Sequence, residues 1–428
     1  MSPVRNFWTE AQWKEWFAKG ELLPFFQPIL SVETDSIYGY EALGRFKDFE
    51  GRIHSLGSFF VSELPSHSTQ DERKSFREFK RIVDREIRRK ALEMMANSTV
   101  VGADTKIFLN ISPSFMMDYL EYFAHEEPFT LRSAKELGLN QNRVVIEIVE
   151  EHFSGEIDQL KPLINLYKQE GFIIAIDDLG AGSSNLDRIG AFHPGIIKVD
   201  LRLIRSSVSS RNHQEILFTL SRMAESLGCH LLFEGIETET ELYNALSYGA
   251  RYLQGFYFAE PSFYLSDKSK LNVRFSQLHE LFFNYKKYQV LRRIRKEKEL
   301  EDRLESSGIE VWGEGDRTKV TVRNPQLLRE SVVRIYTTNT EGRQLCPNYT
   351  SLANGEFDED PSFIGRNWCW RPYFLDQFYK NEKDPSGNWI GSTPYFDLES
   401  RTLLITYSKK LSSQHVLFVD VKMWDYPE

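Results

Sequence analysis

The sequence predicts an α/β fold: a TIM-like (β/α)₈ barrel with one antiparallel strand, then a long linker helix and a small α+β domain. Three observations predict it. Short apolar runs alternate with helical patterns about eight times before residue 262. Acidic or amide residues stand directly after several of these runs. Beyond residue 268 the pattern changes to one long helical repeat and then to strand-rich sequence.

The predicted barrel strands are apolar, often β-branched runs bounded by turn residues. The first two lie so close together that they form a hairpin rather than a βαβ unit, which predicts the antiparallel strand. The predicted strands are residues 25–30, 38–43, 106–111, 144–149, 172–177, 196–199, 230–234 and 252–258. The predicted helices between them are 71–95, 114–137, 156–170, 214–227 and 239–247.

The end of the chain follows a different pattern. Apolar residues recur every three or four positions from Leu271 to Ile294, and a charge-dense stretch follows, which predicts a connecting helix. Apolar runs at 332–337, 402–408 and 416–421 predict an antiparallel sheet. The predicted domains are therefore a barrel over residues 1–267, a helix over 268–306 and a small domain over 307–428.

Composition narrows the class of protein. A chain of 428 residues is long enough for two or three domains, and 41% hydrophobic with 27% charged residues is ordinary for a globular protein. No apolar run approaches the roughly 20 residues that span a bilayer. The N-terminus lacks the pattern of a secretion signal, and the three cysteines are widely spaced, so we expect a cytoplasmic protein with reduced thiols. A net charge of −9 argues against a nucleic-acid polymer as partner.

The polar residues after the apolar runs predict an acidic pocket. The carboxyl ends of barrel strands meet at one end of a barrel, where active sites lie. Oxygen-rich pockets of this kind suit Mg²⁺ or Mn²⁺. Two such ions about 3.5–4 Å apart can activate water and neutralise a phosphate. The residues are Glu41, Asn110, Glu147, the pair Asp177 and Asp178, and Glu234.

An ordered set of motifs in this sequence resembles that of a known protein family. The set is Glu41-Ala42-Leu43, Asn110, Glu147 with Glu150, Asp177-Asp178-Leu179-Gly180, Lys198-Val199-Asp200, Glu234-Gly235-Ile236-Glu237 and Gln254-Gly255-Phe256. In this order, over about residues 20–262, the sequence resembles the EAL-domain family of bacterial cyclic-di-GMP phosphodiesterases. The resemblance implies hydrolysis of cyclic-di-GMP to linear pGpG with two divalent cations.

The resemblance also implies a role for each residue. Glu41, Asn110, Glu147 and Asp177 would hold the first cation, and Asp178 the second. The catalytic groups would be Glu234 as general base, Lys198 to orient water, and Asp178. Glu150 would anchor the loop after Asp178, unless it is a surface glutamate. The substrate contacts would be Gln27, Leu43, Arg45, Asp200, Glu237, Gln254 and Phe256. The alternative interpretation of Lys198 and Asp200 is a structural ion pair. The alternative for Phe256 is an aromatic residue of the core.

The last domain resembles a subgroup in which an EAL barrel precedes a PAS- or Cache-like sensory domain. The two stretches on which this resemblance rests are Asn367-Trp368-Cys369-Trp370-Arg371-Pro372-Tyr373-Phe374 and Ser392-Thr393-Pro394-Tyr395-Phe396-Asp397. The expected pocket for a small ligand is lined by Trp368, Arg371, Tyr373, Tyr395 and Asp397. The alternative is that these aromatic residues fill the core of the sheet domain. We expect a sensory or dimerisation role for this domain, and a homodimer.

Three functional hypotheses remain. The first is the metal-dependent phosphodiesterase, regulated by the C-terminal domain. The second is a weak or inactive cyclic-di-GMP receptor. It is motivated by Gly44, where most of the family has leucine, and Leu179, where phenylalanine is usual. The third is an unrelated metal-dependent barrel enzyme, which the ordered motifs disfavour.

Overall fold

The structure is a computed structural model. It describes residues 8–65, 67–149, 157–179, 185–265, 271, 275–329, 331–352, 354–383, 387–397 and 400–423. The chain divides into two compact units, Met1–Phe282 and Phe283–Glu428. Within the described ranges, no helix has both the length and the apolar character needed to cross a membrane.

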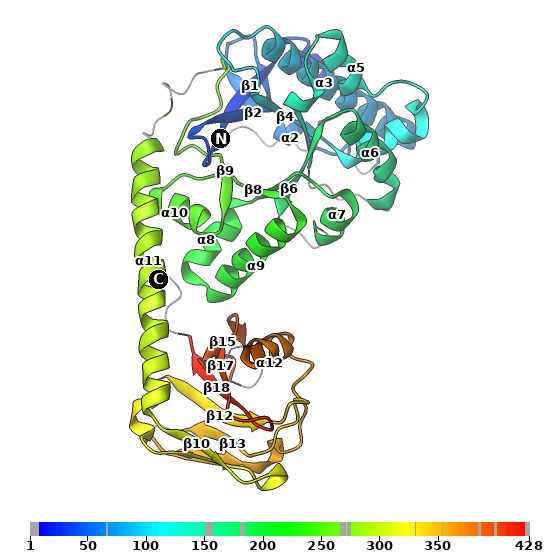
Figure 1. Ribbon diagram of the computed structural model, residues 1–428. Coiled ribbons are helices and arrows are strands. Elements are labelled where there is room, and N and C mark those ends of the chain that lie inside the picture. The colour runs from blue at the N-terminus through cyan, green and yellow to red at the C-terminus, as the bar shows by residue number, and fades with distance from the viewer. Residues whose placement is uncertain are drawn as a thin grey trace. The chain divides into compact units, whose positions relative to one another are not determined.

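The first unit is a closed barrel whose eight strands follow one another around the ring (Figure 1). The ring runs β1-β9-β8-β7-β6-β5-β4-β2 and closes where β2 pairs with β1, while β3 extends β2 outside it. The strands are β1 (Glu21–Ser31), β2 (Ser36–Lys47), β3 (Ile53–Ser55), β4 (Lys106–Ile111), β5 (Val144–Ile148), β6 (Ile173–Leu179), β7 (Ile196–Val199), β8 (His230–Phe233) and β9 (Ala250–Leu253).

Strand β1 is the antiparallel member of the barrel. It pairs antiparallel with both β2 and β9, whereas the other neighbours in the ring are parallel. The predicted barrel with one antiparallel strand is therefore confirmed. β1 is antiparallel to β2 because the two strands form a hairpin, whose short connection leaves no room for a crossover helix.

The last barrel strand is shorter than the sequence predicted. β9 ends at Leu253, and the residues from Gly255 to Phe258 form a turn. This turn lies against the segment after β8, since the amide of Tyr257 donates to the carbonyl of Ile236 at 2.9 Å. A Cβ at Gly255 would lie 2.1 Å from that carbonyl oxygen, so the approach requires glycine.

Helices surround the barrel. They are α3 (Gln70–Ala96), α4 (Pro113–Asp118), α5 (Phe129–Glu136), α6 (Lys161–Gln169), α7 (Asn185–Phe192), α8 (Leu201–Ser209), α9 (Arg211–Leu227) and α10 (Glu239–Ser247). The single helix predicted for 114–137 is wrong: α4 runs into a π-helical turn, Tyr119–Phe123, and α5 begins after Pro128. Proline has no N–H to continue a helix and favours a new start. Helices α7 and α8 were not predicted.

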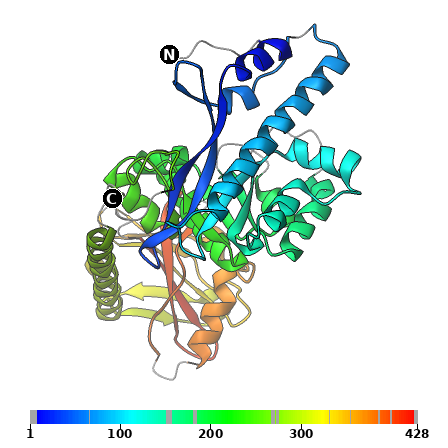
Figure 2. The same ribbon diagram turned by 90° about the horizontal axis from the view of Figure 1, so that it is seen from above.

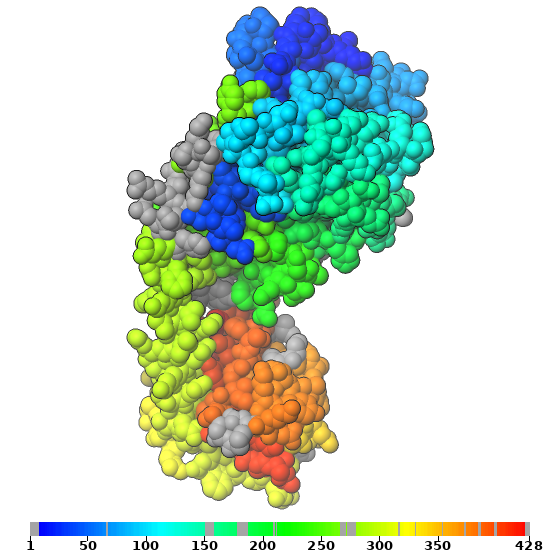
Figure 3. Space-filling view, turned by 45° about the horizontal axis from the view of Figure 1, so that its top comes forward, coloured from blue at the N-terminus to red at the C-terminus, as the bar shows by residue number. Residues whose placement is uncertain are grey.

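The first unit has two hydrophobic layers and a lobe. Seven residues fill the inside of the barrel, and a larger core lies between the strands and the surrounding helices. The lobe is a separate aromatic cluster built by α1 (Glu10–Phe17), α2 (Gly57–Phe60), the outer ends of β1 and β2, and the start of α3. Figure 2 shows α1 standing to one side of the barrel, and dark blue residues of the lobe lie at the top of Figure 3.

The second unit is an antiparallel sheet with one covering helix, α12 (Pro372–Lys383). The sheet order is β14-β13-β12-β18-β17-β15, and β16 also pairs with β17. The strands are β12 (Val332–Thr338), β13 (Asn348–Ser351), β14 (Phe357–Asp360), β15 (Ile390–Gly391), β16 (Tyr395–Phe396), β17 (Leu403–Lys410) and β18 (Val416–Lys422), with a separate pair β10 (Ile309–Trp312) and β11 (Lys319–Val322).

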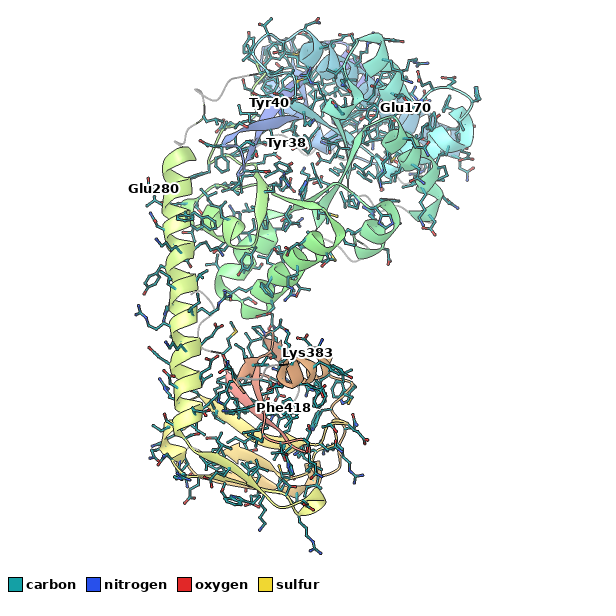
Figure 4. The ribbon with its side chains drawn as sticks, viewed as in Figure 1. Tyr38, Tyr40, Glu170, Glu280, Lys383 and Phe418 are labelled. Atoms are coloured by element: carbon teal, nitrogen blue, oxygen red, sulfur yellow. The ribbon has the colours of Figure 1, made fainter. Side chains whose placement is uncertain are left out.

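The core of the second unit explains its stability. Phe418 of β18, labelled in Figure 4, stacks between Tyr336 and Phe374 with ring centroids 5.3 and 5.2 Å away. The end of the long helix α11 (Phe275–Ser306) completes this core through Leu300 and Leu304, which are buried. The predicted strand-rich α+β domain after a long helix is confirmed.

Candidate functional site

A ring of polar side chains lies one layer above the apolar interior of the barrel. Residues two apart on a strand share a face, so each polar residue points the same way as its apolar neighbour. On β1 the order is reversed because the strand runs the other way. The apolar and polar partners are Ile29 and Gln27, Phe108 and Asn110, Val145 and Glu147, Ala175 and Asp177, Ile196 and Lys198, Leu232 and Glu234, and Tyr252 and Gln254.

Glu41 joins this ring through a β-bulge in β2. Ile29 pairs with Gly39 and Leu30 with Ile37, which leaves Tyr38 as an extra residue. Tyr38 therefore packs inside the barrel while Tyr40, two residues later, packs outside it; both are labelled in Figure 4. Glu41 follows Tyr40 and faces the interior, since its carboxylate contacts Gln254.

Lys198 is the centre of the ring. Its Nζ lies 2.9 Å from Oε2 of Glu234, 3.0 Å from Oδ1 of Asp177 and 3.7 Å from Oε2 of Glu41. It also pairs with Oε1 of Glu147, which is fully buried. The side chain of Lys198 is 1% exposed. Carboxylates from β2, β5 and β6 and from the end of β8 thus converge on one ammonium.

The excess of carboxylates shifts their pKa values. Burial, with the nearby Asp177 and Glu41 carboxylates, raises the pKa of Glu234 to about 8, although Lys198 opposes the shift. Burial likewise raises the pKa of Glu147 well above its usual range. Burial by itself would lower the pKa of Lys198, but the surrounding carboxylates raise it well above its usual value. The site therefore holds extra protons at neutral pH, and the lysine stays charged.

A chain of amide groups supports Glu41. Asn110 Nδ2 donates to Glu41 Oε1 at 2.9 Å, and Gln254 Nε2 donates to Glu41 Oε2 at 2.7 Å and to Gln27 Oε1 at 3.1 Å. Gln27 in turn donates to the carbonyl of Ala259 at 3.3 Å, a contact that sequence reasoning did not identify. Since a backbone carbonyl carries no residue-type signal, no sequence pattern could have found it.

The donor set fits a hard divalent cation. Carboxylates and an amide oxygen are the ligands that Mg²⁺, Mn²⁺ and Ca²⁺ prefer. Oε2 of Glu147 and Oε1 of Gln254 are buried without a hydrogen-bond partner, which leaves lone pairs directed into the site. Within the described residues, however, no three His, Cys, Asp or Glu side chains already form a cation cage.

The other predicted substrate contacts are more scattered. Arg45 is half-buried, lies over the Phe25 ring at 5.7 Å, and has its pKa lowered by burial. Leu43 is half-buried and Phe256 is 52% exposed. Asp200 caps α8 and pairs with Arg202 at 3.0 Å, and Glu237 pairs with Arg205 at 2.8 Å.

Three predicted residues lie wholly or partly outside the described residues. Glu150 is one of them, and the side chains of Asp178 and Tyr373 are the others. The backbone of Asp178 belongs to β6, directly after Asp177.

Two of the predicted C-terminal pocket residues, Trp368 and Tyr395, lie against Arg371. Its guanidinium lies over the rings of Trp368 at 5.5 Å and Tyr395 at 5.4 Å, and its Nε is buried without a hydrogen-bond partner. A small recess is lined by Arg371, Trp368 and Arg334, among others. Asp397 does not reach into it as a free anchor, because it is paired with the buried Arg334.

Comparison with known proteins gives matches over both units. Residues 10–261 match the family model of the EAL domain, and residues 265–426 match that of an EAL-domain associated signalling protein domain. The chain is 30% identical over 409 residues, 94% of each chain, to the uncharacterized EAL-domain containing protein YkuI of Bacillus subtilis (strain 168). It is 26% identical over 252 residues to the probable cyclic di-GMP phosphodiesterase PdeG of Escherichia coli (strain K12), covering 58% of this chain and 46% of that one.

A solved structure shares the fold over nearly the whole chain. The crystal structure of Bacillus subtilis YkuI, in complex with substrate c-di-GMP and calcium, matches with a TM-score of 0.78 at 29% identity. The match covers 95% of this chain and 97% of that one.

Proposed function

Because the chain belongs to the EAL domain family, we propose that it hydrolyses cyclic-di-GMP to linear pGpG at the polar ring of the barrel. The observation that carries the proposal is the environment of Lys198. Its ammonium lies within 4 Å of carboxylates from four strands or strand ends. A structural core has no need of so many buried ionisable groups, which are costly to bury.

Divalent cations would complete the site. Glu41, Asn110, Glu147 and Asp177 would hold one ion, and Asp178 would contribute to a second. Bound cations would neutralise the phosphate and promote ionisation of water. We propose Mg²⁺ or Mn²⁺ as the native ion. The calcium named in the YkuI complex supports a divalent cation at this kind of site.

Glu234 and Lys198 would carry the proton chemistry. In its ionised form, Glu234 would accept a proton from the attacking water, and its pKa of about 8 means that this form becomes the main one only above neutral pH. The water oxygen would form a bond to phosphorus, and the bond from phosphorus to the 3′ oxygen would break. The proton taken from the water would pass to the 3′ oxygen, which leaves as a hydroxyl. Lys198 keeps its positive charge and would stabilise the negative charge that develops on the phosphate.

The remaining residues would bind the nucleotide. We propose that Arg45 pairs with a phosphate, since a guanidinium fork matches two oxygens. Gln27 and Gln254 would contact polar groups of the substrate, and the exposed Phe256 ring would stack on a base. We propose that the substrate also contacts Leu43, Asp200 and Glu237 in the same pocket. Glu150 would anchor the loop that follows Asp178.

The C-terminal domain would regulate the barrel. We propose a PAS- or Cache-like sensory role, in a cytoplasmic homodimer, with residues 268–306 as the connecting helix between the barrel (1–267) and this domain (307–428). The recess beside Arg371 supports binding of a small ligand there, because the unpaired Nε offers a donor between aromatic walls.

One endpoint assay tests the proposal. The protein is incubated with cyclic-di-GMP and Mg²⁺ or Mn²⁺, and nucleotides are separated by chromatography. We expect pGpG from the wild type and from Glu63→Ala, a matched control at an exposed glutamate, and none from Glu41→Ala. Equal product from Glu41→Ala would contradict the assignment of the site.

A receptor is the second candidate, and the surroundings of Gly44 favour it. A Cβ at Gly44 would lie 2.9 Å from Cδ1 of Ile87 and 3.2 Å from Cδ1 of Leu56. α3 and the residues before α2 therefore pack closer to the strand than a leucine would permit, and Arg45 is the next residue. Cyclic-di-GMP that binds to the wild type and is recovered intact would support the receptor.

A further inference from the structure

A second polar site lies outside the barrel ring, between α3 and the helices that cover β4. It is a shallow recess that opens to solvent. Three arginines of one face of α3 line it, Arg81, Arg85 and Arg88, and none of its lining residues is acidic. These positions are four and three residues apart, so they share one face of the helix.

The guanidinium groups alternate with phenyl rings. Arg81 lies over the Phe123 ring at 4.2 Å, Arg85 over the Phe129 ring at 5.2 Å, and Arg88 over the Phe129 ring at 5.6 Å. Phe123 ends the π-helical turn that joins α4 to the segment before α5. Such turns are frequent at functional sites because they redirect side chains. Here the turn places Phe123 against Arg81, and the start of α5 places Phe129 against Arg85 and Arg88.

Two of the three arginines have a carboxylate partner, and Arg88 also donates to the hydroxyl of Thr130. Arg81 pairs with Glu78 through Nη2, and Arg88 pairs with Asp84 at 3.1 Å through Nε. The side chain of Arg81 is 6% exposed, yet its Nη1 has no hydrogen-bond partner. Arg85 makes ring contacts but forms no ion pair with a carboxylate among the described residues. Burial and the like charges of Arg81 and Arg88 lower its pKa, although Glu78 and Asp84 oppose the shift.

A buried guanidinium nitrogen without an acceptor is costly and marks a missing partner. The partner must offer negative oxygen atoms, since a guanidinium is a donor only. Phosphate suits three arginines better than a carboxylate, because it presents more oxygens and up to two charges. The aromatic part of the wall, with Tyr119 and Phe115, would cover an organic group attached to the phosphate.

We propose that this recess is a binding site for a small phosphate monoester, separate from the catalytic ring. Ile111 lines the recess, and Asn110, the residue before it on β4, donates to Glu41 in the ring. A ligand here would thus contact the strand that carries Asn110. The proposal does not depend on the proposed hydrolysis, because it concerns binding alone.

The test uses the full chain in EDTA, with inorganic phosphate and phenyl phosphate as probes at constant ionic strength. We expect both probes to raise the melting temperature of the wild type, and phenyl phosphate to bind more tightly. Arg85→Gln should weaken binding by about tenfold or more, since it removes a charged donor. Arg89→Gln, which removes a partly exposed arginine of α3 outside the recess, should bind like the wild type.

Three results would overturn the proposal: no shift in the wild type, an equal shift in Arg85→Gln, or phenyl phosphate binding no tighter than phosphate. If Arg85→Gln does not fold, chemical modification of the wild type tests the proposal instead. Phenylglyoxal labelling read by mass spectrometry should then show Arg85 protected by phosphate and Arg89 not protected. Equal labelling of Arg85 with and without phosphate would also overturn it.

Discussion

The ammonium of Lys198 lies 2.9 Å from Oε2 of Glu234, and this contact joins the end of β7 to the end of β8 inside the barrel. The pair is surrounded by further carboxylates rather than by compensating cations. The stability of the barrel and the chemistry of its site are therefore coupled through the same few charges.

Replacing Lys198 by methionine should destabilise the cation-free protein in a pH-dependent way. The change leaves buried carboxylates without their counter-charge, and breaking a buried pair from one side costs about 3–5 kcal/mol. We expect a loss of that order at pH 8 and a smaller loss at pH 5, where Glu234, with its pKa of about 8, is protonated. Urea unfolding at the two pH values measures both. Losses that are the same at pH 5 and pH 8 would show that packing, not charge, is responsible.

Glu234 should make the cation-free protein less stable as pH rises. Its pKa is raised to about 8 in the folded state, so the folded chain binds one more proton than the unfolded chain between about pH 4.5 and 8. The free energy of unfolding should fall across this window, by up to about 1.4 kcal/mol per pH unit from this group. Glu234→Gln cannot titrate and should reduce the slope. An unchanged slope in Glu234→Gln would contradict the shift.

Gly39 should tolerate no side chain. A Cβ there would lie 2.7 Å from the backbone carbonyl oxygen of Lys106, on the strand paired with it. Gly39→Ala should therefore cost about 1–3 kcal/mol, as overpacking does. Gly190→Ala is the control: it lies in α7 with nothing within 4 Å of its Cβ, and should be neutral or stabilising by up to about 1 kcal/mol. Thermal unfolding of both variants checks the contrast.

Gln254 should matter for nucleotide binding. Its Nε2 bridges Glu41 and Gln27, and its Oε1 is buried without a partner. Gln254→Met keeps the volume but removes these polar groups, so we expect cyclic-di-GMP to bind about tenfold more weakly in the presence of Ca²⁺. Equilibrium dialysis measures the affinity, with the exposed Gln70→Met as control. An unchanged affinity would place the nucleotide away from this residue.

Much of the barrel could be predicted because its signals are local. Apolar runs and the short hairpin between β1 and β2 report strand positions and the antiparallel pair directly. Residues such as Asn110 and Glu147 could be assigned to one end because each directly follows an apolar run and lies near the carboxyl end of its strand. By contrast, the helix predicted for 114–137 is interrupted by a π-helical turn, whose last residue, Phe123, lies against Arg81 of α3.

By itself the sequence determined the barrel, its one antiparallel strand and the polar residues at the strand ends, because a two-residue period and chain order suffice for these. Only the tertiary structure decided which of them meet. The bulge at Tyr38 turns Glu41 inward, Lys198 takes the centre of the ring, and Asp200 pairs with Arg202 at the start of α8. The three arginines of α3 likewise share a recess only because α4, α5 and α6 close over them. A linear pattern specifies the face on which a side chain lies, whereas its neighbours depend on strand register, ring closure and helix packing, which bring together residues distant in sequence.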